Sequence, residues 1–212
     1  MSENKEKKLP LVYLEIDFDD MQSGVDAISF VDMPATEVEW KMFSKESKQM
    51  FEKNEVERIL TGPVMLAETP IIRFSPFIGE YFIKFSEKTI SQMMKKYFKE
   101  NKIHKVNEHH DSKRQVKDVY MIESFIVNER TKTNIFDVPN GTWMASFFVE
   151  DEDYWNDVVM SGEFKGFSLE GMFSEVFEGE LIEQVYSKID KMLEHPDEEF
   201  VYDEIKRILN IK

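Results

Sequence analysis

The segment that most restricts how this chain can fold is an apolar run, Phe164 to Phe173, with a serine at its centre. Its middle, Gly166-Phe167-Ser168-Leu169-Glu170-Gly171, is typical of a β-strand, although serine and glycine are poor strand residues. A strand that keeps a serine and two glycines indicates that the serine hydroxyl is needed there and that another segment of backbone lies close to it. Ser168 is therefore a candidate nucleophile, and a base elsewhere in the chain would have to activate it.

Composition limits the classes of protein that this chain can represent. Its 212 residues suit one domain, and 42% apolar residues supply a core. Acidic residues outnumber basic ones by 42 to 27, and the net charge of -15 disfavours nucleic acid and anionic membranes as partners. The absence of cysteine excludes disulfides and a thiol nucleophile. The charged start resembles no signal peptide and no segment has the length of a membrane span, so we expect a soluble intracellular protein without a cofactor.

Periodicity predicts mostly strands, joined by a few helices. We expect strands at residues 11–18, 27–31, 38–43, 64–67, 71–74, 81–85, 116–127 and 141–149, and in the serine segment. We expect helices at residues 86–102, with Ser86 as N-cap, and 151–160, a short exposed helix at 46–57, and two helices after Gly179. Thr61-Gly62-Pro63 predicts a turn. The resulting division is a flexible tail (1–10), a main domain (11–178) and a helical extension (179–212).

The four histidines are His104, His109, His110 and His195, and three of them lie within one polar segment. Histidine is the usual base for a serine nucleophile. A catalytic zinc is an alternative use of the cluster, but the spacing matches no regular ligand pattern. A third interpretation is a polar surface loop without chemistry.

Glu123 is the most unusual acid, because the run from Val119 to Val127 is otherwise almost entirely apolar. A carboxylate in a buried strand needs a partner, which would suit the third member of a catalytic triad. Period-two alternation would instead turn Glu123 toward solvent, and both interpretations stay open. Glu170 is a weaker candidate, on the same strand face as Ser168. The pattern Gly-x-Ser-x-x-Gly departs from the hydrolase nucleophile elbow, whose second glycine comes one residue earlier.

Several segments taken in order resemble the phage prohead serine proteases, and specifically their XkdF-like branch. No single one of these motifs is specific, but their joint order is. The matching segments are 27–32 with Pro34-Ala35, 60–63, 71–73, 81–89, 106–111, 123–127, 139–144 and 166–171.

The resemblance implies residue roles. In that family the base lies in an Asn-x-x-His-Asp type segment, which makes His110 the base and places His109 where relatives usually have an acid. That departure leaves His109 as the alternative base. Ser168 matches the nucleophile, and Glu123 is carried over as the third member. Gly166 and Gly171 would let substrate backbone approach closely.

The resemblance also implies a fold and a setting. The wider group is similar to herpesvirus assembly proteases, so the expected class is α+β: a small, mostly antiparallel β-barrel surrounded by helices, here with two C-terminal helices. The implied activity is a serine endopeptidase inside the phage prohead, in the host cytoplasm. Its substrates would be scaffold protein and major capsid protein, with self-cleavage and a homo-oligomer as further expectations. The alternative is a catalytically degenerate protease-fold protein that serves as a scaffold or assembly factor.

Overall fold

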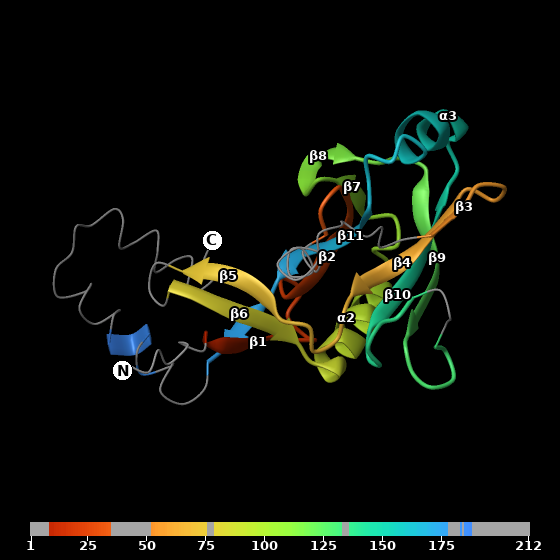
Figure 1. Ribbon diagram of the computed structural model, residues 1–212. Coiled ribbons are helices and arrows are strands. Elements are labelled where there is room, and N and C mark those ends of the chain that lie inside the picture. Colours follow the sequence, from red (N-terminus) through yellow and green to blue (C-terminus); the bar gives the residue numbers. More distant parts are fainter. Residues whose placement is uncertain are drawn as a thin grey trace, which may run out of the picture.

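The computed structural model describes residues 9–34, 52–75, 79–132, 136–177, 183 and 185–187. Within these residues the chain forms three four-stranded sheets and a few helices. Figure 1 shows the sheets side by side, with the strands β5 and β6 at one end and β3, β4, β9 and β10 at the other. The main hydrophobic core draws on all three sheets, from Val12 and Ile83 through Phe30 to Trp143 and Phe147.

The first sheet has the order β12 (Ser174–Val176), β1 (Leu11–Glu15), β6 (Gly79–Phe85) and β5 (Ile71–Ser75). β1 and β6 are parallel, and the other two pairs are antiparallel. Alternate residues of β6 are buried, namely Tyr81, Ile83 and Phe85. This period-two pattern gives the sheet one inward face.

The second sheet is antiparallel throughout, in the order β3 (Glu52–Asn54), β4 (Ile59–Met65), β10 (Trp143–Val149) and β9 (Val119–Ile126). β10 lacks charged residues and is buried along nearly its whole length. Such a strand suits the interior of a sheet that is covered on both faces.

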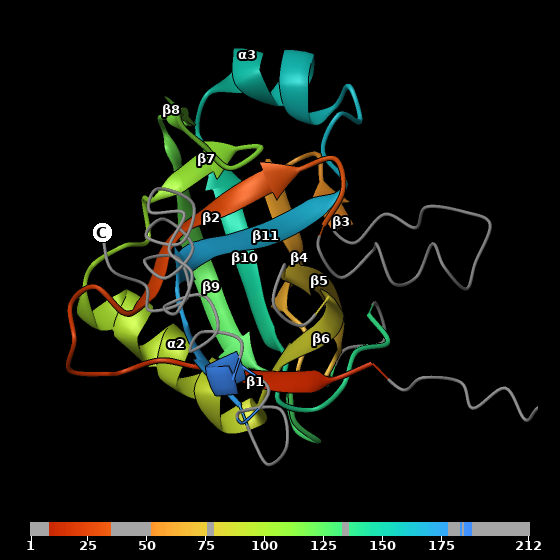
Figure 2. The ribbon, with the colours of Figure 1, turned by 90° about the vertical axis from the view of Figure 1, so that its left-hand side faces the viewer.

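The third sheet carries the serine segment, in the order β11 (Gly166–Met172), β2 (Gly24–Val31), β7 (Val106–Glu108) and β8 (Asp111–Gln115). β2 pairs antiparallel with β11 and parallel with β7. Figure 2 shows β2 and β11 running together across the front of the molecule. β2, from the N-terminal part of the chain, is thus joined to a strand from the middle of the chain and to one near the end of the described residues.

Helical segments accompany the sheets. α2 (Glu87–Lys99) begins at Ser86, whose hydroxyl accepts a hydrogen bond from the Thr89 amide as an N-cap does. It packs on β2 and β10 through Ile90, Met93 and Tyr97. α3 (Glu152–Tyr154) continues directly into a π-helical turn, η1 (Trp155–Val159). Among the described residues no helix has the length and apolar character needed to cross a membrane.

The mostly β architecture agrees with the expected class, whereas the herpesvirus-protease-like barrel is not confirmed. The third sheet has the edge strands β11 and β8, and the second has the edge strands β3 and β9. Because these edges are not paired with each other, the described strands do not close a barrel. Most predicted strands and both central helices are found, with shifted ends. The predicted strand at 38–43, the N-terminal tail up to residue 8 and most of the C-terminal extension lie outside the described residues.

Two local predictions are wrong for identifiable reasons. Thr61-Gly62-Pro63 lies inside β4 and not in a turn. The partner β10 shifts register beside this segment, between Trp143 and Met144, as at a bulge, where a sheet accepts proline. In the region predicted as an exposed helix at 46–57, residues 52–54 form β3.

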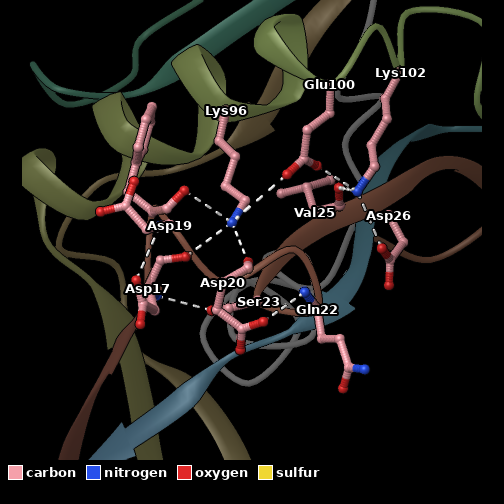
Figure 3. A network of polar contacts seen from close by, with 11 residues as sticks. Asp17, Asp19, Asp20, Gln22, Ser23, Val25, Asp26, Lys96, Glu100 and Lys102 are labelled. Atoms are coloured by element: carbon pink, nitrogen blue, oxygen red, sulfur yellow. Dashed lines mark hydrogen bonds and ion pairs between the residues drawn. The ribbon is translucent and has the colours of Figure 1, made fainter.

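A buried lysine ties the β1–β2 loop to helix α2. The Lys96 side chain is only 2% exposed, and its ammonium group donates hydrogen bonds to the carbonyl oxygens of Asp17 (2.9 Å), Phe18 (3.1 Å) and Asp20. Glu100 lies 3.6 Å away on the next turn of the helix. Figure 3 shows the loop folded around the ammonium group. Lys96 thereby satisfies backbone carbonyls that pair with no strand.

Replacing this lysine should destabilise the fold. Lys96→Met keeps the aliphatic stem but removes the ammonium donor from three carbonyl oxygens, of which, among the described residues, only that of Asp20 keeps another donor, the Ser23 amide. We therefore expect a loss of roughly 3 kcal/mol in the free energy of unfolding. Lys95→Met, on an exposed position of the same helix, is the matched control and should change stability by less than about 0.5 kcal/mol. Urea denaturation of both variants measures the difference. Equal stabilities would show that the loop does not depend on Lys96.

Candidate active site

Three polar residues form a row across neighbouring strands of the third sheet. Ser168 on β11 lies opposite Ser29 on β2, and Ser29 lies opposite Asn107 on β7. Residues at opposed positions project from the same face of a sheet. The other face carries Phe30 and Phe167, whose rings lie 5.5 Å apart in the aromatic core. Strand alternation thus separates an apolar face from a polar face.

His109 and His110 form the two-residue turn between β7 and β8. Glu108 and Asp111 pair across the hairpin, and the two histidines have φ angles of 50° and 60°. Two positive φ values match a type I′ turn, in which asparagine and glycine are the usual residues. The polar segment, for which the sequence leaves a surface loop as one of three interpretations, is therefore a tight hairpin. Histidine in both turn positions carries backbone strain, and such strain is often found at functional sites.

The turn directs its two histidines to different partners. His109 Nε2 lies 3.0 Å from Glu163 Oε1, and its ring packs against Phe164. His110 Nδ1 lies 3.1 Å from Ser29 Oγ and 3.3 Å from Glu170 Oε1. The structure therefore brings His110, and not His109, to the polar row that contains Ser168.

Side chains on both strands hold the hairpin in place. Glu108 forms an ion pair with Arg114 and accepts a hydrogen bond of 2.9 Å from the Tyr154 hydroxyl. Burial, together with the Glu108 carboxylate, raises the pKa of Tyr154, so its hydroxyl remains a donor. The His109 amide also donates to the Phe30 carbonyl, which extends the β2–β7 pairing into the turn.

A compact polar cluster surrounds the His110 imidazole. Ser29 Oγ lies 2.6 Å from Asn107 Oδ1 and 2.6 Å from Glu170 Oε1. The Asn107 side-chain amide donates to the same Glu170 oxygen at 2.6 Å. Ser29 and Asn107 are almost fully buried, whereas the His110 side chain is 42% exposed. The imidazole thus has a fixed inner side and an open outer side.

A cleft of about 560 Å³ lies beside this cluster. β11 lines one side of it, from Ser168 to Met172. The inward face of the first sheet lines the other, with Leu14, Ile71, Arg73, Tyr81, Ile83 and Phe85. Strand register explains that shared face, because Leu14 pairs with Phe85, Ile71 with Ile83, and Arg73 with Tyr81. The first sheet therefore contributes a mostly apolar wall that also carries Arg73, and polar groups come from His110, Ser168 and Glu170 on the other side.

Ser168 and His110 both line this cleft. Ser168 is 7% exposed and lies one strand from Ser29, which contacts the imidazole. Among the described residues no hydrogen bond joins Ser168 to His110. In substrate-free enzymes catalytic hydrogen bonds are often long and shorten on substrate binding.

Glu123 lies in another sheet from His110. It projects from β9, where its carboxylate accepts a hydrogen bond of 2.7 Å from Ser146, and Ser146 lies 2.9 Å from Thr61 Oγ1. Glu123 is exposed, as the alternation pattern indicated, and also paired. The structure does not bring it together with His110, so its role as third member stays a prediction.

Sequence reasoning gave no role to Ser29 or Asn107. Ser29 interrupts the apolar strand 27–31 as Ser168 interrupts its own strand, and that shared irregularity was the available signal. Asn107 was visible only as a motif position. His104 packs near Tyr120 outside the cluster, and His195 lies outside the described residues. In the part of the chain that the structure describes, no group of three or more His, Asp or Glu side chains is arranged to hold a metal ion.

Gly171 has a structural reason different from the expected one. A Cβ atom at this position would lie 2.0 Å from the Gly24 carbonyl oxygen. The β11–β2 register shifts here, between Glu170 and Gly171. Close approach of β2 therefore requires this glycine.

Gly171→Ala should consequently disturb the strand pair that carries Glu170. Because the clashing atom belongs to the backbone, relief requires a strand shift, and we expect a loss of about 3 kcal/mol in the free energy of unfolding. Gly162→Ala is a useful comparison, since its φ of +81° is strained but no atom lies near its Cβ. It should cost only about 1 kcal/mol. Thermal denaturation ranks the two, and equal losses would contradict the close contact with Gly24.

Comparison with known proteins adds a family. Residues 49–178, more than half of the chain, match the model of the family described as "Putative phage serine protease XkdF". No curated protein and no solved structure matches the chain.

Proposed function

Because the chain belongs to this family of XkdF-type phage serine proteases, we propose that it is a serine endopeptidase of phage head maturation with Ser168 as nucleophile and His110 as base. The observation that carries the proposal is the shared cleft, into which a strand-borne serine and a partly exposed imidazole both face. A serine and a histidine on the wall of one cleft are the minimum for acyl transfer.

The orientation of His110 supports the assignment. Its Nδ1 atom faces Ser29 and Glu170, which leaves Nε2 as the nitrogen for the nucleophile. A neutral imidazole that carries its proton on Nδ1 presents a lone pair on Nε2. This is the arrangement that a general base for serine requires.

The reaction then follows in two steps. His110 Nε2 removes the Ser168 hydroxyl proton as Oγ attacks the peptide carbonyl, and the resulting imidazolium gives that proton to the leaving amine. An acyl-enzyme ester remains on Ser168. Water, activated by the same nitrogen, hydrolyses the ester and restores the serine.

The substrates we propose are scaffold and capsid-protein segments inside the prohead. The apolar wall of the cleft, including Leu14, Ile71 and Ile83, suits an apolar side chain beside the cleaved bond. Cleavage of the chain's own flanking segments would use the same site.

Substitution of the two adjacent histidines by asparagine tests the base. Asparagine tolerates the left-handed turn conformation, so both variants should keep the hairpin. We expect His110→Asn to lower the rate of fluorophosphonate labelling and of scaffold cleavage by roughly 10³-fold or more, and Ser168→Ala to abolish labelling. His109→Asn, whose residue contacts Glu163 outside the cleft, is the matched control and should stay within about threefold of wild type.

The opposite ranking of the two histidine variants would assign the base to His109. Cleavage of scaffold by Ser168→Ala at the wild-type rate would overturn the nucleophile. Loss of activity with chelators, without labelling of the wild type, would indicate a metal-dependent hydrolase. Co-assembly with scaffold without cleavage or labelling would indicate a degenerate protease acting as an assembly factor.

A further inference from the structure

We propose that Glu170 is the positioning residue for the His110 imidazole and that Ser29 and Asn107 hold Glu170 in place. The proposal rests on the function proposed above and extends it to three residues outside the Ser168–His110 pair. It also gives Glu170 the role of third triad member, which the resemblance implied for Glu123.

The contacts converge on one oxygen atom. Glu170 Oε1 lies 2.6 Å from Ser29 Oγ, 2.6 Å from Asn107 Nδ2 and 3.3 Å from His110 Nδ1. A carboxylate oxygen can accept several hydrogen bonds, and those from buried donors fix it in place. The oxygen facing the imidazole is therefore positioned before any substrate arrives.

The single hydroxyl proton of Ser29 influences which tautomer His110 adopts. The Ser29 hydroxyl carries a single proton and lies 2.6 Å from both Asn107 Oδ1 and Glu170 Oε1, so it donates to one oxygen at a time. When the Ser29 hydroxyl donates to Asn107 Oδ1, the side-chain NH₂ group of Asn107 still donates to Glu170 Oε1. The carboxylate then keeps a lone pair for the Nδ1 proton of His110. The cluster thus favours the Nδ1–H tautomer, which leaves Nε2 to accept the proton of Ser168.

Strand geometry links the nucleophile and the positioning residue. Ser168 and Glu170 are two residues apart on β11 and therefore share one face. Ser29 and Asn107 come from the next two strands of the same sheet. One rigid sheet thus sets both the serine and the atom that orients its base, as precise catalytic geometry requires.

Three isosteric substitutions, each removing one negative charge, test the assignment. Glu170→Gln alters the carboxylate at His110, Glu123→Gln alters the competing candidate, and Glu163→Gln alters the partner of His109 as a control. The readout is the rate at which a fluorophosphonate labels Ser168 across pH, which requires no knowledge of the substrate. Thermal denaturation checks that each variant is folded.

We expect Glu170→Gln to lower the labelling rate by about 10²–10⁴-fold, because an amide can donate to Nδ1 and favour the wrong tautomer. The pH profile of the labelling rate should change as well, because the group that faces Nδ1 is no longer a carboxylate. Glu163→Gln should keep the wild-type rate and profile. Ser29→Ala should lower the rate by about tenfold through a looser carboxylate.

A spectroscopic signature separates positioning from mere stability. The chain has four histidines, so nitrogen NMR of the imidazoles is simple to assign with His110→Asn. We expect the Nδ1–H tautomer for His110 in the wild type and a shift toward Nε2–H in Glu170→Gln.

The failure of this proposal differs from failure of the proposed function. If Ser168 of the wild type is labelled while folded Glu170→Gln keeps the wild-type rate, profile and tautomer, the positioning role is wrong and the protease assignment stands. A large loss in Glu123→Gln alone would return the role to Glu123. Absence of labelling in the wild type would refute the nucleophile itself.

Discussion

The pairing of β2 with both β11 and β7 is the constraint on which the site depends. β2 is the strand that places Ser29 between Ser168 and Asn107, and its antiparallel and parallel ladders set the register on either side. A slip of one residue in either ladder would turn the polar row toward the aromatic core. Phe30 and Phe167 oppose such a slip because their burial depends on the same register. Packing on one face thus fixes chemistry on the other.

Local patterns in the sequence were enough to predict the elements that depend on near neighbours. Ser86 with its apolar stripe gave α2, and the apolar run around Ser168 gave β11. The hairpin at His109–His110 was missed because it lacks the asparagine and glycine that usually mark a type I′ turn. Pro63 predicts a turn from its local sequence, whereas its tolerance in β4 depends on a register irregularity beside β10 that only the folded sheet reveals.

The acidic partner of His110 is equally hard to predict from local sequence patterns. Glu123 was conspicuous because its neighbours along the chain are apolar, yet its partner proved to be Ser146. Glu170 is only the weaker candidate in the sequence, and the contacts with Ser29 and Asn107 that favour it depend on the pairing of β2 with both β11 and β7. Non-local pairing of this kind leaves little trace in one sequence. The irregular apolar run already marked Ser168 as a candidate, and the resemblance added His110 as the proposed base, because motif order preserves what a local pattern cannot express.

The separation between Ser29 and Glu170 along the chain has a consequence for timing. These residues are 141 positions apart, and the strand that carries Glu170 is the next to last one described. During synthesis the imidazole and its hairpin emerge well before the serine that they would activate. A ribosome-bound chain therefore has no assembled site until β11 has docked on β2, a long-range step that is slow compared with helix formation. On the proposed function, such an order of assembly would delay proteolysis until the chain has folded around its last strands.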